Sequence, residues 1–234
     1  MNRYERQVKM IGEEGQKKLS DAVVVIAGVG GLGTVAATYL AYAGVEDFIL
    51  VDDDAVGLSN LNRQIMYRTS DVRLRKVFLA KERLGQINQH GFIEASIIHI
   101  DESNVDRLIE DSTVVLDCLD NEESRKILCR SAVKQNIPLV YGAVCGWNGI
   151  VMTVHNSACP WCLTGEDYAI EEKSILGATC GIIGSMQVLE AIKIITGKGE
   201  PFLNKGLLWI GFSGEAHVIE QPKDEKCHVC GNSK

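Results

Sequence analysis

The feature that most constrains the fold is a glycine-rich turn between a short apolar run and a helical pattern. Residues 22–27 (Ala-Val-Val-Val-Ile-Ala) read as a buried strand, and Gly28-Val-Gly-Gly-Leu-Gly33 follows directly. Asp52 ends the next apolar run, about 20 residues further on. Glycines at this spacing permit a tight turn and close approach to phosphate, while the carboxylate suits ribose hydroxyls. The motif predicts a nucleotide site, with a phosphate loop that contains Gly28, Gly30, Gly31 and Gly33.

Two cationic segments follow this motif. The first is Leu58-Ser-Asn-Leu-Asn-Arg-Gln64, and the second contains Arg73, Arg75 and Lys76. Arginine and lysine side chains aimed at a phosphate chain indicate that phosphates are transferred or displaced, and not only held. The structural alternative for Arg63 is a surface ion pair with Asp53 or Asp54, and the alternative for Asp52 is a cap on the loop after its strand.

Composition and charge narrow the class of protein. The chain has 234 residues and a hydrophobic content of 46%, which fits one sizeable domain over residues 1–234. A net charge of −7 argues against nucleic-acid binding. The N-terminus has no basic segment followed by an apolar one, and no apolar run approaches membrane-spanning length. We therefore expect a cytoplasmic protein without membrane contact.

The eight cysteines fall into two groups. Two Cys-x-x-Cys pairs lie far apart in the chain, a pattern typical of a tetrahedral zinc site in which each pair supplies two thiolates. A redox motif or two disulfides are the alternatives, and both are disfavoured in a cytosolic chain. The predicted zinc ligands are Cys159, Cys162, Cys227 and Cys230. Three others, Cys118, Cys129 and Cys145, lie in apolar or helical surroundings and are expected to fill the core.

Strand and helix patterns alternate through the first part of the chain. Alternating strands and helices predict an α/β fold with a Rossmann-like, doubly wound and mainly parallel sheet. The predicted strands are 23–27, 47–51, 93–100, 113–117 and 138–144, and the predicted helices are 31–43, 74–87, 105–109 and 121–135.

The pattern changes after Gly146. We expect a strand over 149–155, a mobile loop over 167–177 and a largely buried helix over 180–196. Strands over 207–212 and 216–220 form a hairpin, so the C-terminal strands extend the sheet in antiparallel fashion.

An ordered set of motifs resembles the MoeB/ThiF/HesA adenylyltransferases, prokaryotic relatives of ubiquitin-activating enzymes. The resemblance covers nearly the whole chain and rests on Arg3-Tyr-Glu-Arg-Gln7, Gly28–Gly33, the segment 52–64, Lys76, Asp117-Cys-Leu-Asp-Asn121, the two Cys-x-x-Cys pairs, 183–187 and 190–193. It implies that residues 1–145 form a nucleotide-binding half. Residues 146–234 then form a carrier-binding half with the zinc site and a crossover loop.

The resemblance also implies a reaction. Such enzymes use ATP to activate the C-terminal Gly-Gly of a small ubiquitin-like protein as an acyl-adenylate, and they release pyrophosphate. Arg63 and Lys76 suit the charge that develops on pyrophosphate. Asp120, at the carboxyl end of a strand, suits Mg²⁺. Further nucleotide contacts are assigned to Asp52 for ribose and to Asn60 and Gln64 for phosphate oxygens.

Two further expectations come from the family. The N-terminal arginine, here Arg6, would reach the active site of a neighbouring subunit, which predicts a homodimer. Members that form a thioester or persulfide carry a cysteine in the crossover loop, at a position that falls near Ile170 here. With no cysteine there, Cys180 is either a relocated nucleophile or a core filler, and any sulfur comes from a separate sulfurtransferase.

Other functions remain open at this point. The first is adenylation of a peptide C-terminus or a small carboxylate, and the second is an NAD-binding oxidoreductase. The third is a non-catalytic partner, which would have lost the phosphate-contacting residues. A large exposed apolar surface beside the crossover loop would favour a protein substrate.

Overall fold

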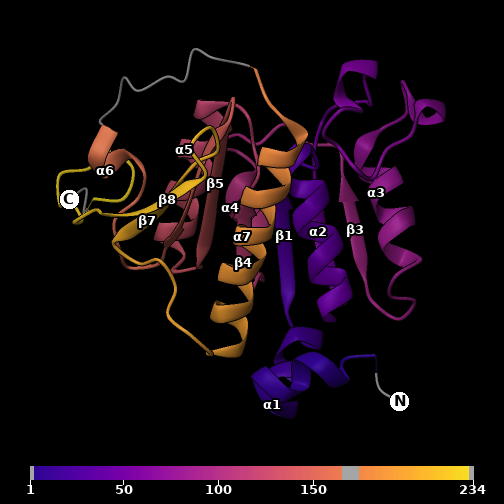
Figure 1. Ribbon diagram of the computed structural model, residues 1–234, viewed down its shortest axis with the longest axis horizontal. Coiled ribbons are helices and arrows are strands. Elements are labelled where there is room, and N and C mark those ends of the chain that lie inside the picture. Colours follow the sequence, from indigo (N-terminus) through magenta and orange to yellow (C-terminus); the bar gives the residue numbers. More distant parts are fainter. Residues whose placement is uncertain (1–2, 165–173, 232–234) are drawn as a thin grey trace.

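The computed structural model describes residues 3–164 and 174–231. These residues form one eight-stranded sheet in the order β3-β2-β1-β4-β5-β6-β7-β8, flanked by helices (Figure 1). The strands are β1 (Val23–Ala27), β2 (Asp47–Val51), β3 (Ile93–Ser96), β4 (Val114–Asp117), β5 (Leu139–Cys145), β6 (Asn148–Val154), β7 (Lys205–Ile210) and β8 (Glu215–Glu220). The helices are α1 (Glu5–Ser20), α2 (Gly31–Ala43), η1 (Leu58–Asn60), η2 (Thr69–Asp71), α3 (Lys76–Gly85), α4 (Val105–Ile109), α5 (Glu122–Lys134), α6 (Trp161–Thr164) and α7 (Gly177–Thr196).

The strand directions confirm the predicted fold class. Strands β3, β2, β1, β4 and β5 pair in parallel, and β6, β7 and β8 continue the sheet with antiparallel pairing. The strand order reverses at β1, which lies between β2 and β4. In open α/β sheets, ligands bind at such a switch point, outside the carboxyl ends of the strands.

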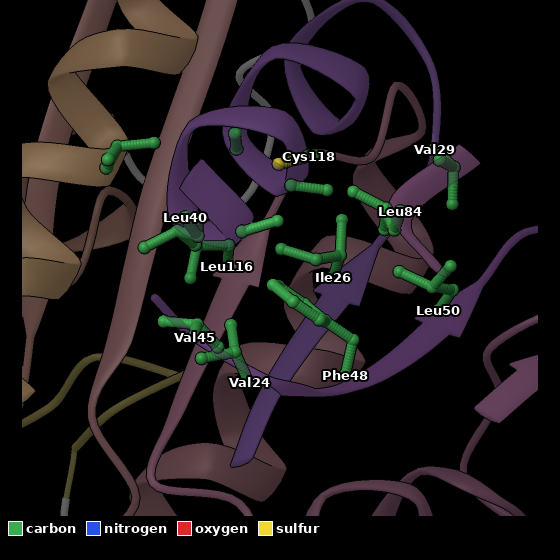
Figure 2. Packing of buried hydrophobic residues seen from close by; sticks show 14 of the residues in the cluster. Val24, Ile26, Val29, Leu40, Val45, Phe48, Leu50, Leu84, Leu116 and Cys118 are labelled. Carbon is green, nitrogen blue, oxygen red and sulfur yellow. The ribbon is translucent and has the colours of Figure 1, made fainter. Parts of the chain in front are cut away.

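Alternate residues of the parallel strands build two separate cores. Val24 and Ile26 of β1 point to one face, where they pack with α2, α3 and α7 (Figure 2). Val25 and Ala27 point to the other face, where they pack with α4 and α5. Burial on both faces explains why these strands read as continuous apolar runs in the sequence.

Helix α7 is the long apolar helix of the second half. By length and composition alone it could cross a membrane, contrary to the expectation that no apolar run reaches that length. The same composition suits a core helix, and α7 packs against α2, α1, β5 and β6.

Some element boundaries differ from the prediction. Helix α7 begins at Gly177, three residues earlier than expected, because Leu176 O accepts the backbone N–H groups of Thr179 and Cys180. Strand β3 stops at Ser96, since its partner β2 ends opposite it at Val51. Most of the predicted loop 167–177, including the position near Ile170, lies outside the described residues.

Candidate nucleotide pocket and metal centre

A cavity of about 560 Å³ opens at the carboxyl ends of the parallel strands. This volume is in the range of small-molecule sites. Most of the residues singled out from the sequence line it: Gly28, Gly30, Gly31, Asp52, Arg63, Gln64, Lys76, Asp120 and Cys180. The cavity is therefore the candidate site, and it lies where the topology predicts one.

The glycine loop lies close against its surroundings. Gly28 has a φ of +88°, and a Cβ there would lie 2.7 Å from Cys118 O. A Cβ on Gly33 would lie 1.9 Å from Gly28 O. At Gly30, in contrast, the nearest atom to a Cβ would be Gln64 Nε2 at 3.5 Å. Gly28 and Gly33 are thus required by packing, whereas Gly30 leaves room above the backbone for a ligand.

Asp52 serves the loop as well as the cavity. Its Oδ2 accepts the Val29 N–H at 2.8 Å, and its Oδ1 accepts the Asp54 N–H at 2.9 Å. Burial raises the pKa of Asp52, and the nearby Lys76 ammonium opposes that rise. The capping role that was the alternative for Asp52 is therefore present, and its carboxylate also lines the cavity.

Lys76 is the first residue of α3 and is buried at 4% exposure. Its ammonium lies 2.7 Å from Asp54 Oδ2 and 3.6 Å from Asp52 Oδ1. A buried ammonium held at the edge of a cavity is suited to bind an anionic ligand, because water screens it little.

Arg63 has no ion pair to Asp53 or Asp54 among residues 3–164 and 174–231. Its guanidinium donates instead to Ser59 O and to Asn62 Oδ1, each at 3.0 Å. These neutral acceptors orient the fork and leave its positive charge available to the cavity.

Of the three remaining nucleotide-binding candidates, Gln64 and Asp120 line the cavity and Asn60 does not. Gln64 is 4% exposed, and its Oε1 has no hydrogen-bond partner within the part of the chain that the structure describes, so the cavity contains a buried polar atom that a ligand can satisfy. Asn60 is not among the lining residues, and its Oδ1 accepts the Gly57 N–H at 2.8 Å to close the η1 turn. Asp120 is exposed and lines the cavity just beyond β4.

Arg6 lies at the other end of the molecule. It is exposed on α1, which Figure 1 shows at the bottom, beyond the amino ends of the strands. It does not line the cavity of its own chain.

Sequence reasoning missed three residues at the site, and two of them, Tyr67 and Arg125, hold its main chain in place. Tyr67 Oη donates to Val29 O in the glycine loop at 2.8 Å. The buried Arg125 donates to Leu119 O and, at 3.0 Å, to Gly142 O, and it pairs with Asp117 at 3.4 Å. Asp117 is fully buried and does not line the cavity, so its ion pair with Arg125 supports the fold, and burial raises the pKa of its carboxyl group to about 6. His99 also lines the cavity and lies 3.1 Å from Asp53.

Cys180 lies in the wall of the cavity. A Cβ on Gly31 would come within 2.8 Å of its sulfur, and the side chain is 1% exposed. Burial raises the pKa of the Cys180 thiol, against the influence of Arg63. A protonated and buried thiol agrees with a core filler more than with a nucleophile.

The four predicted metal ligands meet at a second site. The sulfur atoms of Cys159, Cys162, Cys227 and Cys230 all lie within 4.8 Å of one another. Three of the separations are 3.3, 3.6 and 4.0 Å. Zinc–sulfur bonds of about 2.3 Å in a tetrahedron require sulfur atoms about 3.8 Å apart. The cluster therefore fits a zinc ion, and none of its members lines the nucleotide cavity.

Known proteins match this chain over almost its full length. The model of the ThiF family matches residues 4–230. The Sulfur carrier protein ThiS adenylyltransferase of Escherichia coli is 35% identical over 99% of this chain and 95% of its own length. The Molybdopterin-synthase adenylyltransferase of Salmonella typhimurium is 35% identical over 99% and 96%. Protein HesA, heterocyst, of Trichormus variabilis is 36% identical over 99% and 89%.

Solved structures share the fold. A crystal structure of E. coli MccB with ATP superposes with a TM-score of 0.87 at 22% identity, covering 99% of this chain and 75% of that one. The sequence relationship, the glycine loop and the cysteine cluster all indicate the same family. Because the relatives are named adenylyltransferases, nucleotidyltransferase activity follows from that relationship. The chain therefore belongs to the ThiF family.

Proposed function

We propose that this protein uses ATP and Mg²⁺ to adenylate the C-terminal Gly-Gly carboxylate of a small ubiquitin-like sulfur-carrier protein. The single observation that carries the proposal is the cavity in which Arg63, Lys76 and Asp120 meet the glycine loop. The relatives named for ThiS and molybdopterin-synthase adenylyltransferases support a sulfur carrier as the substrate class.

Each side chain has a role in this proposal. The glycine loop and the amino end of α2 bind the phosphates, and Asp52 binds the ribose. A carboxylate that attacks the α-phosphorus displaces pyrophosphate, so negative charge grows on the departing oxygen. Arg63 and Lys76 stabilise that charge. Asp120 is suited to hold Mg²⁺, which would neutralise the phosphate oxygens.

An exposed aromatic pair supports a protein substrate. Trp147 and Phe212 form an edge-to-face contact with ring centroids 6.1 Å apart, and they are 53% and 84% exposed. Trp147 follows Gly146, which forms a bridge with Ile175, and Ile175 lines the nucleotide cavity. The aromatic pair is thus connected by Gly146 to a residue that lines the cavity, and we assign it the docking of a carrier whose tail reaches ATP.

The organisation of the chain follows from these assignments. Residues 1–145 form the nucleotide-binding half, and residues 146–234 form the carrier-binding half with the zinc site. We further propose a cytoplasmic homodimer in which Arg6 serves the neighbouring cavity, since it lies far from its own. Sulfur would come from a separate sulfurtransferase that attacks the released adenylate.

The direct test is ATP–pyrophosphate exchange with a panel of small Gly-Gly-ending proteins. Exchange that requires one carrier would establish adenylation and identify the substrate. Exchange with a free peptide or a small carboxylate alone would favour the alternative substrate class. Binding of NAD without binding of ATP would contradict the proposal.

The aromatic pair gives a prediction about carrier affinity. Trp147→Ala should raise the KM for the carrier about 10-fold or more, because exposed tryptophans dominate many interfaces. The KM for ATP should not change. Phe92→Ala is the matched control. Phe92 is an exposed aromatic residue (67%) that directly precedes β3, the edge strand at the end of the sheet away from β6 and β7. Equal effects of the two substitutions would show that this pair does not dock the carrier.

Two loop glycines give a second prediction. Gly33→Ala should lower stability by about 1–3 kcal/mol, the usual scale for overpacking, because its Cβ would meet Gly28 O. Gly30→Ala should fold normally but bind ATP about 10-fold more weakly, because its methyl group would occupy the approach of the phosphates. Thermal unfolding and calorimetric titration with ATP measure the two effects separately. Unchanged ATP affinity in Gly30→Ala would place the phosphates elsewhere.

A further inference from the structure

Lys76 lies between two carboxylates of different character. The contact to Asp54 is short, at 2.7 Å, and the Asp54 side chain is 66% exposed. The contact to Asp52 is longer, at 3.6 Å, and the Asp52 side chain is only 9% exposed. One ammonium is therefore shared unequally, in favour of the carboxylate that faces solvent.

This unequal sharing matters because Asp52 is already engaged. Its two oxygens accept the backbone N–H groups of Val29 and Asp54. A full ion pair with Lys76 would take a further acceptor position of this carboxylate, and it would draw the ammonium toward the buried Asp52. Asp52 would then be less available to ribose, and Lys76 less available to phosphates.

The backbone fixes Asp54 beside Lys76. The Lys76 N–H donates to Asp54 O at 3.2 Å, and the neighbouring residues Ala55 and Arg75 form an antiparallel bridge. The side-chain contact therefore bridges two segments whose main chains are already paired. Because the backbone is already ordered, the contact costs only side-chain conformational entropy, and it fixes the position of the Lys76 ammonium.

We propose that Asp54 is a positioning residue that holds the Lys76 ammonium on the open side of the cavity and away from Asp52. This inference rests on the proposed ATP site, and it assigns Asp54 no contact with the reacting atoms. Its effect on ATP passes through Lys76, so the substitution of Asp54 should matter only while Lys76 is present.

The charge of Asp54 makes the inference sharply testable. Asp54 lines the cavity, so removing its negative charge should by simple electrostatics favour an anionic triphosphate. If Asp54 positions Lys76, removing the Asp54 charge should instead weaken ATP binding. Asp54→Asn should raise the Kd for ATP about 5- to 10-fold, measured by calorimetry on the full chain. Asp21→Asn is the control, because it removes the partner of Lys17 from an exposed ion pair of 2.9 Å on the N-terminal side of β1.

A double-mutant cycle identifies the route of the effect. In a Lys76→Ala background, Asp54→Asn should no longer weaken ATP binding. A crystal structure of the nucleotide-free Asp54→Asn variant should show Lys76 Nζ about 3 Å from an Asp52 oxygen. This last readout does not depend on activity or on ATP binding.

The outcomes separate this inference from the proposed function. A wild-type protein that binds ATP but catalyses no exchange with any carboxylate would contradict adenylation. The Asp54 measurements would still test the positioning of Lys76, because they need only ATP binding and a crystal structure. Tighter ATP binding by Asp54→Asn would overturn the inference. So would an equal loss with and without Lys76, or an ammonium that keeps its distance from Asp52 in the variant.

Discussion

Replacing either Arg63 or Lys76 with alanine is expected to lower the rate of ATP–pyrophosphate exchange by about 100-fold or more, the scale for losing one charge-stabilising group. The two side chains approach the cavity from different segments. The guanidinium of Arg63 is oriented by Ser59 O and Asn62 Oδ1, and the ammonium of Lys76 by Asp54. Each therefore meets the phosphates already positioned, so its charge needs no reorganisation during the reaction.

The kinetic constants should show where the stabilisation acts. Charge on the departing pyrophosphate exists mainly in the transition state, so kcat should fall more than the KM for ATP rises. Arg63→Lys keeps the charge but loses the planar fork, and we expect it to recover only part of the rate. Substitutions should be assayed with carrier at saturating concentration.

Arg130→Ala is a suitable control for these measurements. Arg130 forms an ion pair of 3.2 Å with Glu102, and its side chain is 41% exposed. It does not line the cavity, so its removal should leave exchange unchanged. Near-normal exchange in both Arg63→Ala and Lys76→Ala would refute the roles assigned to them.

Local pattern was enough to predict the architecture. Strand β1 is buried on both faces, so its apolar run carried a clear signal, and the glycines after it marked the turn into α2. The paired cysteines were equally informative, because the Cys-x-x-Cys spacing reports a metal site without knowledge of the fold. These features depend on residues close together in the chain.

Contacts between distant segments were not predictable in the same way. Nothing near Tyr67 or Arg125 in the sequence indicates that they bond to main-chain oxygens of the loops that line the cavity. Such roles depend on which segments the sheet order brings together, and a single sequence does not contain that information explicitly.

The unequal sharing of Lys76 illustrates the same limit. Sequence reasoning gave Asp52 to ribose and Lys76 to phosphate, and it considered Asp54 only as a partner for Arg63. The short hairpin-like bridge between Ala55 and Arg75 brings Asp54 to Lys76 instead. An alternation of strand and helix signals could not reveal this bridge, because it lies in an irregular segment.

Loss of a metal ligand is the second large effect that we expect. Cys230→Ser should reduce bound zinc from about one ion per chain to nearly none, since a structural site needs four protein ligands. The melting temperature should fall by roughly 5–10 °C, the scale for a loss of a few kcal/mol in a chain of this size. Elemental analysis and thermal unfolding of the purified protein measure the two quantities.

The structure explains why the metal matters for the second half of the chain. Cys159 and Cys162 belong to the segment around α6, whereas Cys227 and Cys230 lie near the end of the described residues, and Figure 1 shows this last yellow segment beside α6. Trp161, next to Cys162, packs edge-to-face on Tyr141 of β5 with ring centroids 6.0 Å apart. The metal would thus fasten the C-terminal segment to the sheet.

Acid should release the zinc ion, because protons compete with the metal for the cysteine sulfur atoms, and chelators should release it by competing for the metal. Burial raises the pKa of the Cys162 thiol to about 11, so binding must displace a proton there, and low pH favours the metal-free form. Cys145→Ser is the control for thiol content, because Cys145 lies outside the cluster, and it should retain full zinc. Because the cluster does not line the nucleotide cavity, Cys230→Ser should still bind ATP well below its melting temperature. Full zinc in Cys230→Ser, or disulfides in place of metal in the wild-type protein under reducing conditions, would contradict the assignment.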